Sequence, residues 1–360
     1  MTSAQIIVLA TPLFLALMAL EWAVGQARAR NTYHLHDMLS STGLGVFSQV
    51  LGLLTKLFAL GLYVAVYETW AFKQLPANAA WVWLTALLLY DFLYYWHHRL
   101  GHRVALLWAA HVVHHQSEDY NLSTALRQTS TGWIFGWVFY MPMALLGFPP
   151  LVFGVVALVD LLYQFWVHTQ LIGRLGWFDR WFCAPSNHRV HHAVNDAYVD
   201  RNYGGILIIW DRLFGSFAPE RDDEPCIYGT RSPLRSFNPL WANFEVYASL
   251  WRDSWHTRAW ADKLRLWLKP PGWRPLDVAQ RFPKAAFDIL QVQRFEPRTA
   301  HWAKACSAAL LLLLLGAATA VLWFAHLLPL WLQALAAALI LAGLCLMGRL
   351  GAGLASDRSR

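Results

Sequence analysis

Seven long apolar stretches limit the folds that are open to this 360-residue chain. A helix needs about 20 apolar residues to cross the roughly 30 Å of hydrocarbon in a bilayer. We therefore expect an all-α integral membrane protein, built as a helical bundle of several spans. The stretches occupy residues 6–24, 43–66, 79–96, 131–148, 150–168, 307–325 and 329–348.

The composition and the placement of charge support a membrane protein. Only 14% of the residues are charged, against about 25% in soluble domains. The net charge of +7 could indicate a nucleic-acid partner, but the cations follow the membrane topology. If the first stretch runs from outside to inside, every Lys and Arg except Lys56 and Lys73 falls on the inner side or at its edge. We therefore expect no nucleic acid as a partner.

This orientation puts the N-terminus outside and both 169–306 and the C-terminus in the cytoplasm. The membrane would be the bacterial inner membrane or the endoplasmic reticulum. The stretches 131–148 and 150–168 meet at Pro149 and Pro150, which cannot continue a helix, so the chain turns there. An alternative stays open in which these two stretches enter the bilayer only part-way.

The first apolar stretch and the cysteines give two further expectations. The stretch 6–24 lacks a basic leader and a small-residue cleavage site, so we expect a retained anchor rather than a signal peptide. The four cysteines are far apart and form no CxxC pair, which predicts neither a disulfide framework nor a zinc knuckle.

The order of the apolar stretches divides the chain into four regions. We expect N-terminal membrane helices, a catalytic region, a cytosolic helical or loop segment and a C-terminal membrane hairpin, at 1–78, 79–240, 241–305 and 306–360.

Three histidine clusters carry the chemistry of the sequence. Within each cluster the spacing is i, i+3 or i+4, which presents the rings on one face of a helix. Neutral imidazole binds Zn, Cu, Fe and Ni, and eight ligands are too many for one tetrahedral zinc. We therefore predict a dinuclear metal site in a cytosolic, histidine-rich cap. The clusters are His98 and His102; His111, His114 and His115; and His188, His191 and His192.

Helix geometry predicts a break between the first two clusters. At about 100° per residue, His111 would lie about 220° around an unbroken helix from His98. The chain must therefore bend between Gly101 and Arg103, with the second cluster on a separate helix along the membrane surface. The third cluster can join the others only if 131–168 returns the chain to the same side.

Further polar residues near the clusters are candidates for the site. His168 ends a stripe with Asp160 and Gln164, and polar residues within a membrane usually face the protein interior; we take it as the ninth ligand. Asp91 lies two turns before His98, where a carboxylate could orient a ligand histidine. A helix continuing past His115 would bring the next acidic residues to the metal face. The supporting or substrate-binding candidates are Asp91, His97, Glu118, Asp119, Asn121, Asp160, Gln164 and Asn202; the other five histidines lack partners at ligand spacing.

A family resemblance rests on these motifs. Residues 80–240 contain "DFLYYWHHRLGH", "WAAHVVHHQ", "NHRVHH" and "NYGGILIIWDRLFGSF", which resemble the fatty acid hydroxylase (sterol desaturase) superfamily of membrane di-iron proteins. The segments "HHQSEDYNLSTALRQ", "LLYQFWVHTQ", "IYGTRSPLRSFNP" and "KPPGWRP" are similar to its alkylglycerol monooxygenase branch. The resemblance implies two irons and O2-dependent hydroxylation of a lipid, at the ether-linked carbon of glyceryl ethers in that branch. Fatty acyl lipids, sterols and carotenoids remain open as substrates, as does desaturation.

The electron donor stays open because of one departure from the branch. Its members use tetrahydrobiopterin and have Glu after the HxxxH motif, where this chain has Arg103. Arginine is always charged and offers a pterin no hydrogen-bond acceptor. The donor is therefore either a tetrahydropterin held by other groups, such as Glu118 and Asp119, or a separate reductase. The sequence identifies no cofactor-binding residue and gives no oligomeric state.

A different class of function also fits a histidine-rich membrane protein, namely a metal transporter or sensor. A transporter places polar ligands along a path near the midplane, whereas these clusters lie at the ends of the apolar stretches. A metallohydrolase is not indicated, because the chain contains no HExxH motif.

Overall fold

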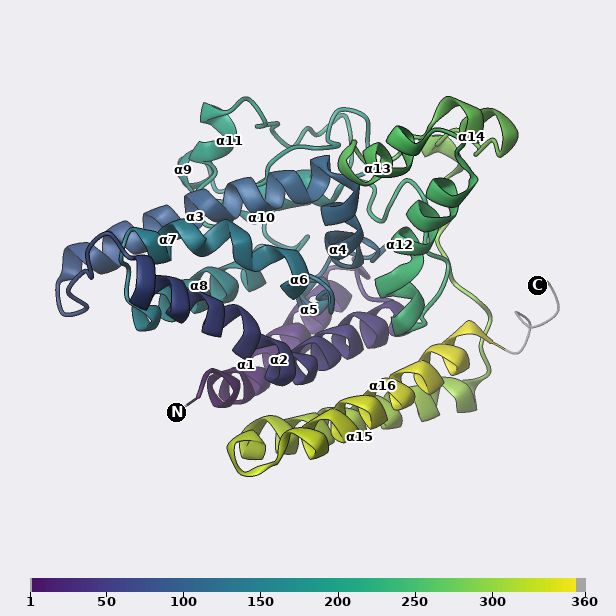
Figure 1. Ribbon diagram of the computed structural model, residues 1–360. Helices are drawn as coiled ribbons and strands as arrows, with labels where there is room; N and C mark the ends of the chain where they lie inside the picture. The colour runs from purple at the N-terminus through teal and green to yellow at the C-terminus, as the bar shows by residue number, and fades with distance from the viewer. Residues whose placement is uncertain (1, 354–360) are drawn as a thin grey trace.

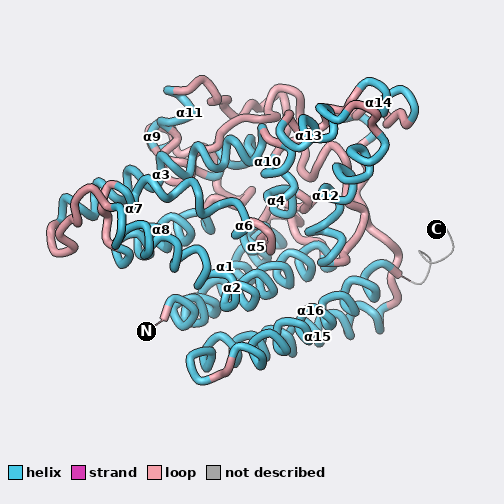
Figure 2. Tube along the Cα trace, in the orientation of Figure 1, coloured by secondary structure: helices cyan, strands magenta, loops and turns pink. Residues whose placement is uncertain are grey.

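The computed structural model describes residues 2–353 and, within them, all side chains except those of residues 3, 56 and 57. It is helical throughout, with isolated β-bridges but no strand in the described part of the chain, as predicted (Figures 1 and 2). The α-helices are α1 (Ser3–Ala27), α2 (Leu35–Trp70), α3 (Ala80–Arg103), α4 (Ala105–His115), α5 (Leu122–Leu126), α6 (Trp133–Gly136), α7 (Met141–Leu145), α8 (Pro150–Trp166), α9 (Phe178–Trp181), α10 (Pro185–His192), α11 (Ile209–Leu213), α12 (Pro239–His256), α13 (Trp260–Leu268), α14 (Leu276–Arg281), α15 (His301–Phe324) and α16 (Leu330–Ala352). Short 3-10 helices are η1 (Trp137–Tyr140), η2 (Ile289–Gln291) and η3 (Ala325–Leu327).

Four helices are long and apolar enough to cross a membrane. They span Ala4–Ala27, Leu35–Thr55, His301–Leu327 and Leu330–Ala352. Figure 1 shows α1, α2, α15 and α16 running roughly parallel at one side of the molecule. Their buried side chains form one core, in which Leu39 and Val50 of α2 meet Leu314 of α15 and Ile340 and Leu344 of α16.

Not every one of the seven apolar stretches forms a helix that is long and apolar enough to cross a membrane. The stretch 131–148 is no single helix but the succession α6, η1 and α7, broken around Gly136 and Pro142. Helix α8 has 17 residues and is too short to cross alone. Helix α3 is long enough, but Asp91 and its many Tyr, Trp and His residues make it too polar to rank with the four. The lengths fit the alternative in which 131–168 enters the bilayer part-way.

A second core fixes α3, α7 and α8 to one another. Tyr63 of α2 stacks on Phe153 of α8, and Tyr90 of α3 stacks on Tyr140 before α7. Helix α8 thereby runs back along α3, so the chain returns to the end where α3 finishes. The cations Arg358 and Arg360, counted above as cytoplasmic, lie outside the described residues.

The break predicted between the first two histidine clusters is confirmed. Helix α3 ends at Arg103, Val104 is extended, and α4 begins at Ala105. Helix α4 is held in its new direction because the backbone N–H of Ala105 donates to the carbonyl of Lys269 at 2.9 Å. Helices α12 and α13 pack against α4, and residues 283–300 then lead back to α15 (Figure 1).

Candidate metal centre

The structure brings together all nine histidines that the sequence singled out as ligands. Each ring offers a nitrogen within 4.8 Å of those of its neighbours. The rings form two sets, which we call the five-histidine group and the four-histidine group. The first contains His98, His102, His111, His115 and His191; the second contains His114, His168, His188 and His192.

Two helices contribute to both groups and hold them side by side. On α4, His115 joins the five-histidine group and His114 the four-histidine group. On α10, His191 joins the first, while His188 and His192, one turn apart, join the second. The ring centroids of His115 and His192 lie 4.3 Å apart across the boundary. The two groups are therefore neighbouring sites, as a dinuclear centre requires.

Backbone carbonyls fix the tautomers of four rings. The Nδ1 atoms of His98, His114, His168 and His191 lie 2.7–3.0 Å from the carbonyl oxygens of Tyr203, Arg127, Gln164 and Arg201. A carbonyl only accepts, so each Nδ1 carries the proton and donates it. The Nε2 atom of each ring is then a free lone pair, which is how proteins orient histidine ligands toward a metal.

The spacing of these lone pairs fits bound metal ions. The Nε2 atoms of His114 and His168 lie 3.2 Å apart, yet both lack a proton and cannot hydrogen-bond to each other. Metal–nitrogen bonds of about 2.0–2.1 Å separate neighbouring ligand nitrogens by about 3.0–3.4 Å. In addition, the buried Nε2 atoms of His102 and His191 have no hydrogen-bond partner. A cation in each group would satisfy all of these atoms.

Burial keeps the rings neutral. Burial lowers the pKa of His114 to about 4 and that of His191 to about 3. Burial, together with the neighbouring rings His98, His114 and His191, also lowers the pKa of His111 well below its usual value. At neutral pH the groups therefore offer the uncharged imidazole that metal binding needs.

A cavity of about 330 Å³ meets the centre from the membrane side. His111, His114 and His168 line it where it reaches the histidines, and mainly apolar side chains of α1, α2, α8 and α15 line much of the rest. The Asp160, Gln164 and His168 stripe faces inward, as predicted. Tyr94 donates its hydroxyl proton to Gln164 at 2.7 Å, and the amide of Gln164 donates to Asp160 at 2.6 Å. A polar chain thus runs beside the histidines in a largely apolar cavity.

Comparison with known proteins decides the family. The family model for fatty acid hydroxylase matches residues 83–216, which contain every one of the nine histidines. Alkylglycerol monooxygenase of Xenopus tropicalis is 37% identical over 308 residues, covering 85% of this chain and 68% of that protein. The chain belongs to the fatty acid hydroxylase family.

Other relatives agree with this family. Alkylglycerol monooxygenases of Danio rerio and Homo sapiens are 43% and 42% identical, over 74% and 76% of this chain. The chain spans 59% and 62% of the length of these two proteins. No solved structure matches the chain significantly.

Two carboxylates, those of Asp211 and Asp91, hold the 203–210 segment in place through hydrogen bonds. Asp211 accepts from the backbone N–H groups of Tyr203 and Gly204, each at 2.8 Å, and so holds the peptide whose carbonyl orients His98. Asp91 was expected to orient a histidine directly, and this is wrong. It accepts instead from Ile206, Leu207 and the indole N–H of Trp210, at 2.7, 3.2 and 2.8 Å. Asp91 therefore acts on the centre only through the 203–210 segment.

Replacing Asp91 by alanine would leave three donors without an acceptor and loosen this segment. We expect metal affinity to fall about 10- to 100-fold, as when partners of ligand histidines are removed. Metal retained after dialysis against a chelator measures the effect. The matched control is Asp179→Ala, which removes a partly exposed carboxylate of α9 that accepts from the backbone N–H of Leu175 at 2.8 Å. Equal metal retention in both variants would contradict this role.

Asn202 and His97 lie close to the centre without joining either group. Asn202 has a positive φ of 56°, and its amide bridges the carbonyls of Asn187 in α10 and Ala218 at 3.0 and 2.8 Å. It thus fastens α10 to the following loop. His97 stacks on Phe139 with centroids 4.6 Å apart and lines the cavity.

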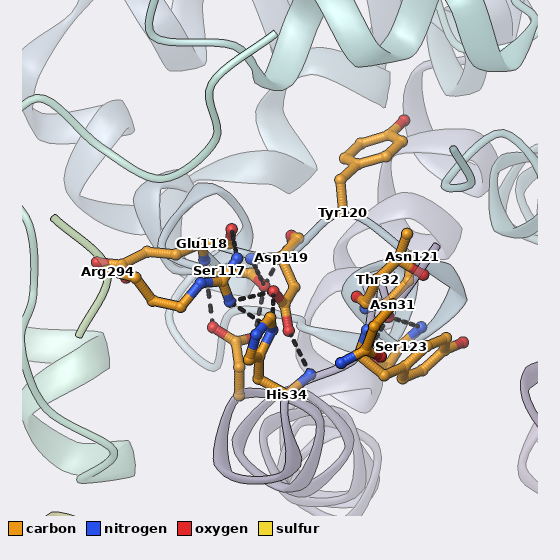
Figure 3. Close-up of polar contacts among 12 residues, drawn as sticks. Asn31, Thr32, His34, Ser117, Glu118, Asp119, Tyr120, Asn121, Ser123 and Arg294 are labelled. Atoms are coloured by element: carbon orange, nitrogen blue, oxygen red, sulfur yellow. Dashed lines mark hydrogen bonds and ion pairs between the residues drawn. The ribbon is translucent and has the colours of Figure 1, made fainter. Parts of the chain in front are cut away.

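The prediction that Glu118 and Asp119 lie near the metal face is wrong. Helix α4 ends at His115, so both residues lie in the turn that follows it, where Figure 3 shows them beside His34 and Arg294. Asp119 accepts from the backbone N–H of His34 at 2.8 Å and pairs with Arg294. Glu118 accepts from the N–H of Phe295 at 2.6 Å. These carboxylates fasten the N-terminus of α2 and the 283–300 segment to the turn, and neither is free to bind a pterin.

Asn121 also has a structural role. Its side chain caps α5 by accepting from the backbone N–H of Ser123 at 2.9 Å, and its amide donates to the carbonyl of Thr32 (Figure 3). Arg103, the departure from the branch motif, does not line the cavity. It is half exposed and pairs with Asp200 at 2.9 Å, so it places no cation in the cavity.

Two buried charges near the centre were missed by the sequence analysis. Glu21 of α1 accepts from the backbone N–H of Leu122 at 2.8 Å and from the hydroxyl of Thr169, next to His168. Arg127 is fully buried and donates to the carbonyl of Val113 at 2.8 Å. Glu21 could have been found, because it is the one acidic residue inside the apolar stretch 6–24.

Proposed function

We propose that the chain is an O2-dependent lipid monooxygenase whose nine histidines hold two irons. The observation that carries this proposal is the pair of histidine groups, with oriented lone pairs, at the end of an apolar cavity. Glyceryl ethers are the substrate class that the relatives' name, alkylglycerol monooxygenase, supports. Hydroxylation or desaturation of fatty acyl lipids or sterols within the same family is the second candidate.

The side chains would divide the work between metal, tail and head group. Iron, when bound, supplies the reduction of O2 and the oxidation of an unactivated C–H bond. The apolar walls from α1, α2 and α15 would hold an alkyl chain and exclude water. The polar chain of Tyr94, Gln164 and Asp160 would take the hydroxyl groups of the head, because Asp160 Oδ1 is buried without a partner. This arrangement would place the carbon beside the head group next to the histidines.

A metal transporter or sensor is disfavoured by the same geometry. Its ligands should follow a path through the bilayer, whereas these nine gather where α3 and α8 end, on α4 and on α10. The electron donor is either a tetrahydropterin or a separate reductase. Since Glu118 and Asp119 are engaged elsewhere, a pterin would need other contacts.

The central test measures metal content and turnover together. We expect protein purified without oxygen to contain two irons per chain and to consume O2 with an alkylglycerol. Tetrahydrobiopterin as sole reductant should support product formation if the donor is a pterin. Activity only with a ferredoxin and its reductase would assign a protein donor instead. One metal per chain, or copper alone, would refute the di-iron centre.

In the proposed topology the 24-residue helix α3 also crosses the bilayer, which places the histidines on the cytoplasmic side. Lys73, exposed in the loop between α2 and α3, should be outside, and Asp222, in the loop after α11, should be inside. In a Cys306→Ala background, we expect a membrane-impermeant maleimide to label Lys73→Cys in intact cells and Asp222→Cys only after lysis. Labelling of position 222 in intact cells would reverse the orientation.

A further inference from the structure

Helices α12 and α13 present an aromatic surface that the proposed reaction does not use. Both follow the segment matched by the family model, which ends at residue 216. The exposed fractions of Trp251, Trp255, Trp260 and Leu264 are 65%, 74%, 81% and 72%. We call this set, with Phe244 and Leu268, the tryptophan face. Several large apolar side chains exposed side by side on a folded protein mark an interaction site.

The tryptophan face is rigidly mounted. The opposite side of the hairpin packs on α4, where Leu250 and Leu266 are buried against Ala105 and Ala109. The Nζ atom of Lys263 in α13 donates to the carbonyl of Ser254 in α12 at 2.8 Å, which ties the two helices together. The exposed rings are therefore a built feature of the fold and not a frayed end.

Two contacts fix this hairpin at the level of the membrane boundary. The start of α12 packs on the end of α16, where Gly348 leaves room for the backbone of Phe237. Further along α12, Tyr247 bonds to Thr131 at 3.2 Å, directly before the apolar segment of α6 to α7. Both partners belong to segments that enter or border the bilayer. Figure 1 shows α12 crossing the ends of the parallel helices rather than continuing them.

The charges around the tryptophan face are complementary to anionic lipid. Arg252, Arg258 and Lys269 are exposed, and none of them forms an ion pair within residues 2–353. Of the three acidic residues in the hairpin, Glu245 is half-buried, and Asp253 is buried in a pair with Arg274 at 2.6 Å. Asp262 lies 3.3 Å from Arg265. The free charge beside the exposed rings is thus positive.

We propose that the tryptophan face lies in the head-group layer of the membrane and binds anionic phospholipid through Arg252, Arg258 and Lys269. Tryptophan is enriched at this depth of a bilayer, and amphipathic helices with basic flanks lie in its plane. Each cation near an anionic surface strengthens such binding. The hairpin then holds α4, and with it the histidine groups, at a fixed height above the bilayer. This inference does not depend on the reaction that the centre catalyses.

A fluorescent probe tests the position of the face in the full chain. In a Cys306→Ala background, Trp255→Cys carries an environment-sensitive dye, and the protein is placed in phosphatidylcholine nanodiscs. We expect blue-shifted emission that nitroxide-labelled lipid quenches. The control, Asp222→Cys, lies on an exposed loop and should stay unquenched. A probe at 255 that remains in water, or that is shielded only by a second copy of the chain, overturns the proposal.

Lipid selectivity tests the charges. Nitroxide-labelled phosphatidylglycerol should quench the 255 probe several-fold more than labelled phosphatidylcholine at equal mole fraction. The triple variant Arg252→Gln, Arg258→Gln and Lys269→Gln should remove this preference and keep the quenching itself. In the protein that keeps all three cations, raising the salt to about 1 M should weaken the preference for phosphatidylglycerol, since salt screens exposed charges. Equal quenching by the two lipids before any substitution overturns the role of the cations.

Discussion

Replacing His168 by alanine is expected to remove one iron of the proposed pair and to lower turnover at least about 100-fold. Its Nε2 atom lies 3.2 Å from that of His114 and 3.1 Å from that of His188, so the four-histidine group would be left with three rings. Removing even a partner of a ligand histidine costs 10- to 100-fold in metal affinity or activity. Loss of a ligand should cost more.

The measurement is iron per chain by mass spectrometry, beside initial rates of O2 consumption. His97→Ala is the matched control, because this ring lines the same cavity and stacks on Phe139 but belongs to neither group. We expect the control to keep two irons. If His168→Ala also keeps both irons, His168 is no ligand and the second site must rest on His114, His188 and His192.

The convergence of the nine histidines could be predicted from the sequence because the geometry within each cluster is local. Spacings of three and four residues place rings on one helical face whatever the rest of the fold does. The bend at Val104 followed from the same periodicity, since His98 and His111 could not otherwise meet. His168 was found because it ends a polar stripe on an apolar helix.

The supporting residues could not be predicted, because their partners are distant in the chain. Asp91 binds the segment 206–210, and no local pattern shows that these residues meet. The expected place of Glu118 and Asp119 failed for a related reason. Whether α4 continues past His115 is decided by tertiary bonds, such as that from Ser117 to Asp37 at 2.5 Å and those of Asp119 to His34 and Arg294.

The seven apolar stretches outnumber the long apolar helices of the structure. A hydropathy scan counts apolar residues but does not show whether they form one continuous helix. Residues 131–148 are apolar enough to suit lipid, but they fold as short pieces packed on α3 and α2. Their apolar character serves the core around Tyr90, Tyr140 and Met143 as well as the bilayer. A segment buried in protein and a segment buried in lipid are both apolar, so hydropathy alone does not distinguish them.

The second prediction concerns the cavity and the length of the substrate's alkyl tail. Ala318 of α15 is buried and lines the cavity, and α15 contributes no histidine to either group. Replacing it with phenylalanine puts a ring where an alkyl chain would lie. We expect kcat/KM for long-chain alkylglycerols to fall about tenfold or more, because overfilling a packed site costs about 1–3 kcal/mol. Short-chain substrates, which end before this point, should keep most of their rate.

The control places the same ring on the lipid-facing side of the same helix. Leu313 is 68% exposed on α15, so Leu313→Phe adds a ring outside the cavity and should leave the chain-length profile unchanged. Both variants should retain two irons, because α15 contributes no histidine to either group. A loss that is equal for every chain length, with both irons retained, would show that the tail binds elsewhere. A loss confined to long chains would locate the tail between α1, α2 and α15, and would place the reacting carbon at the histidine end of the cavity.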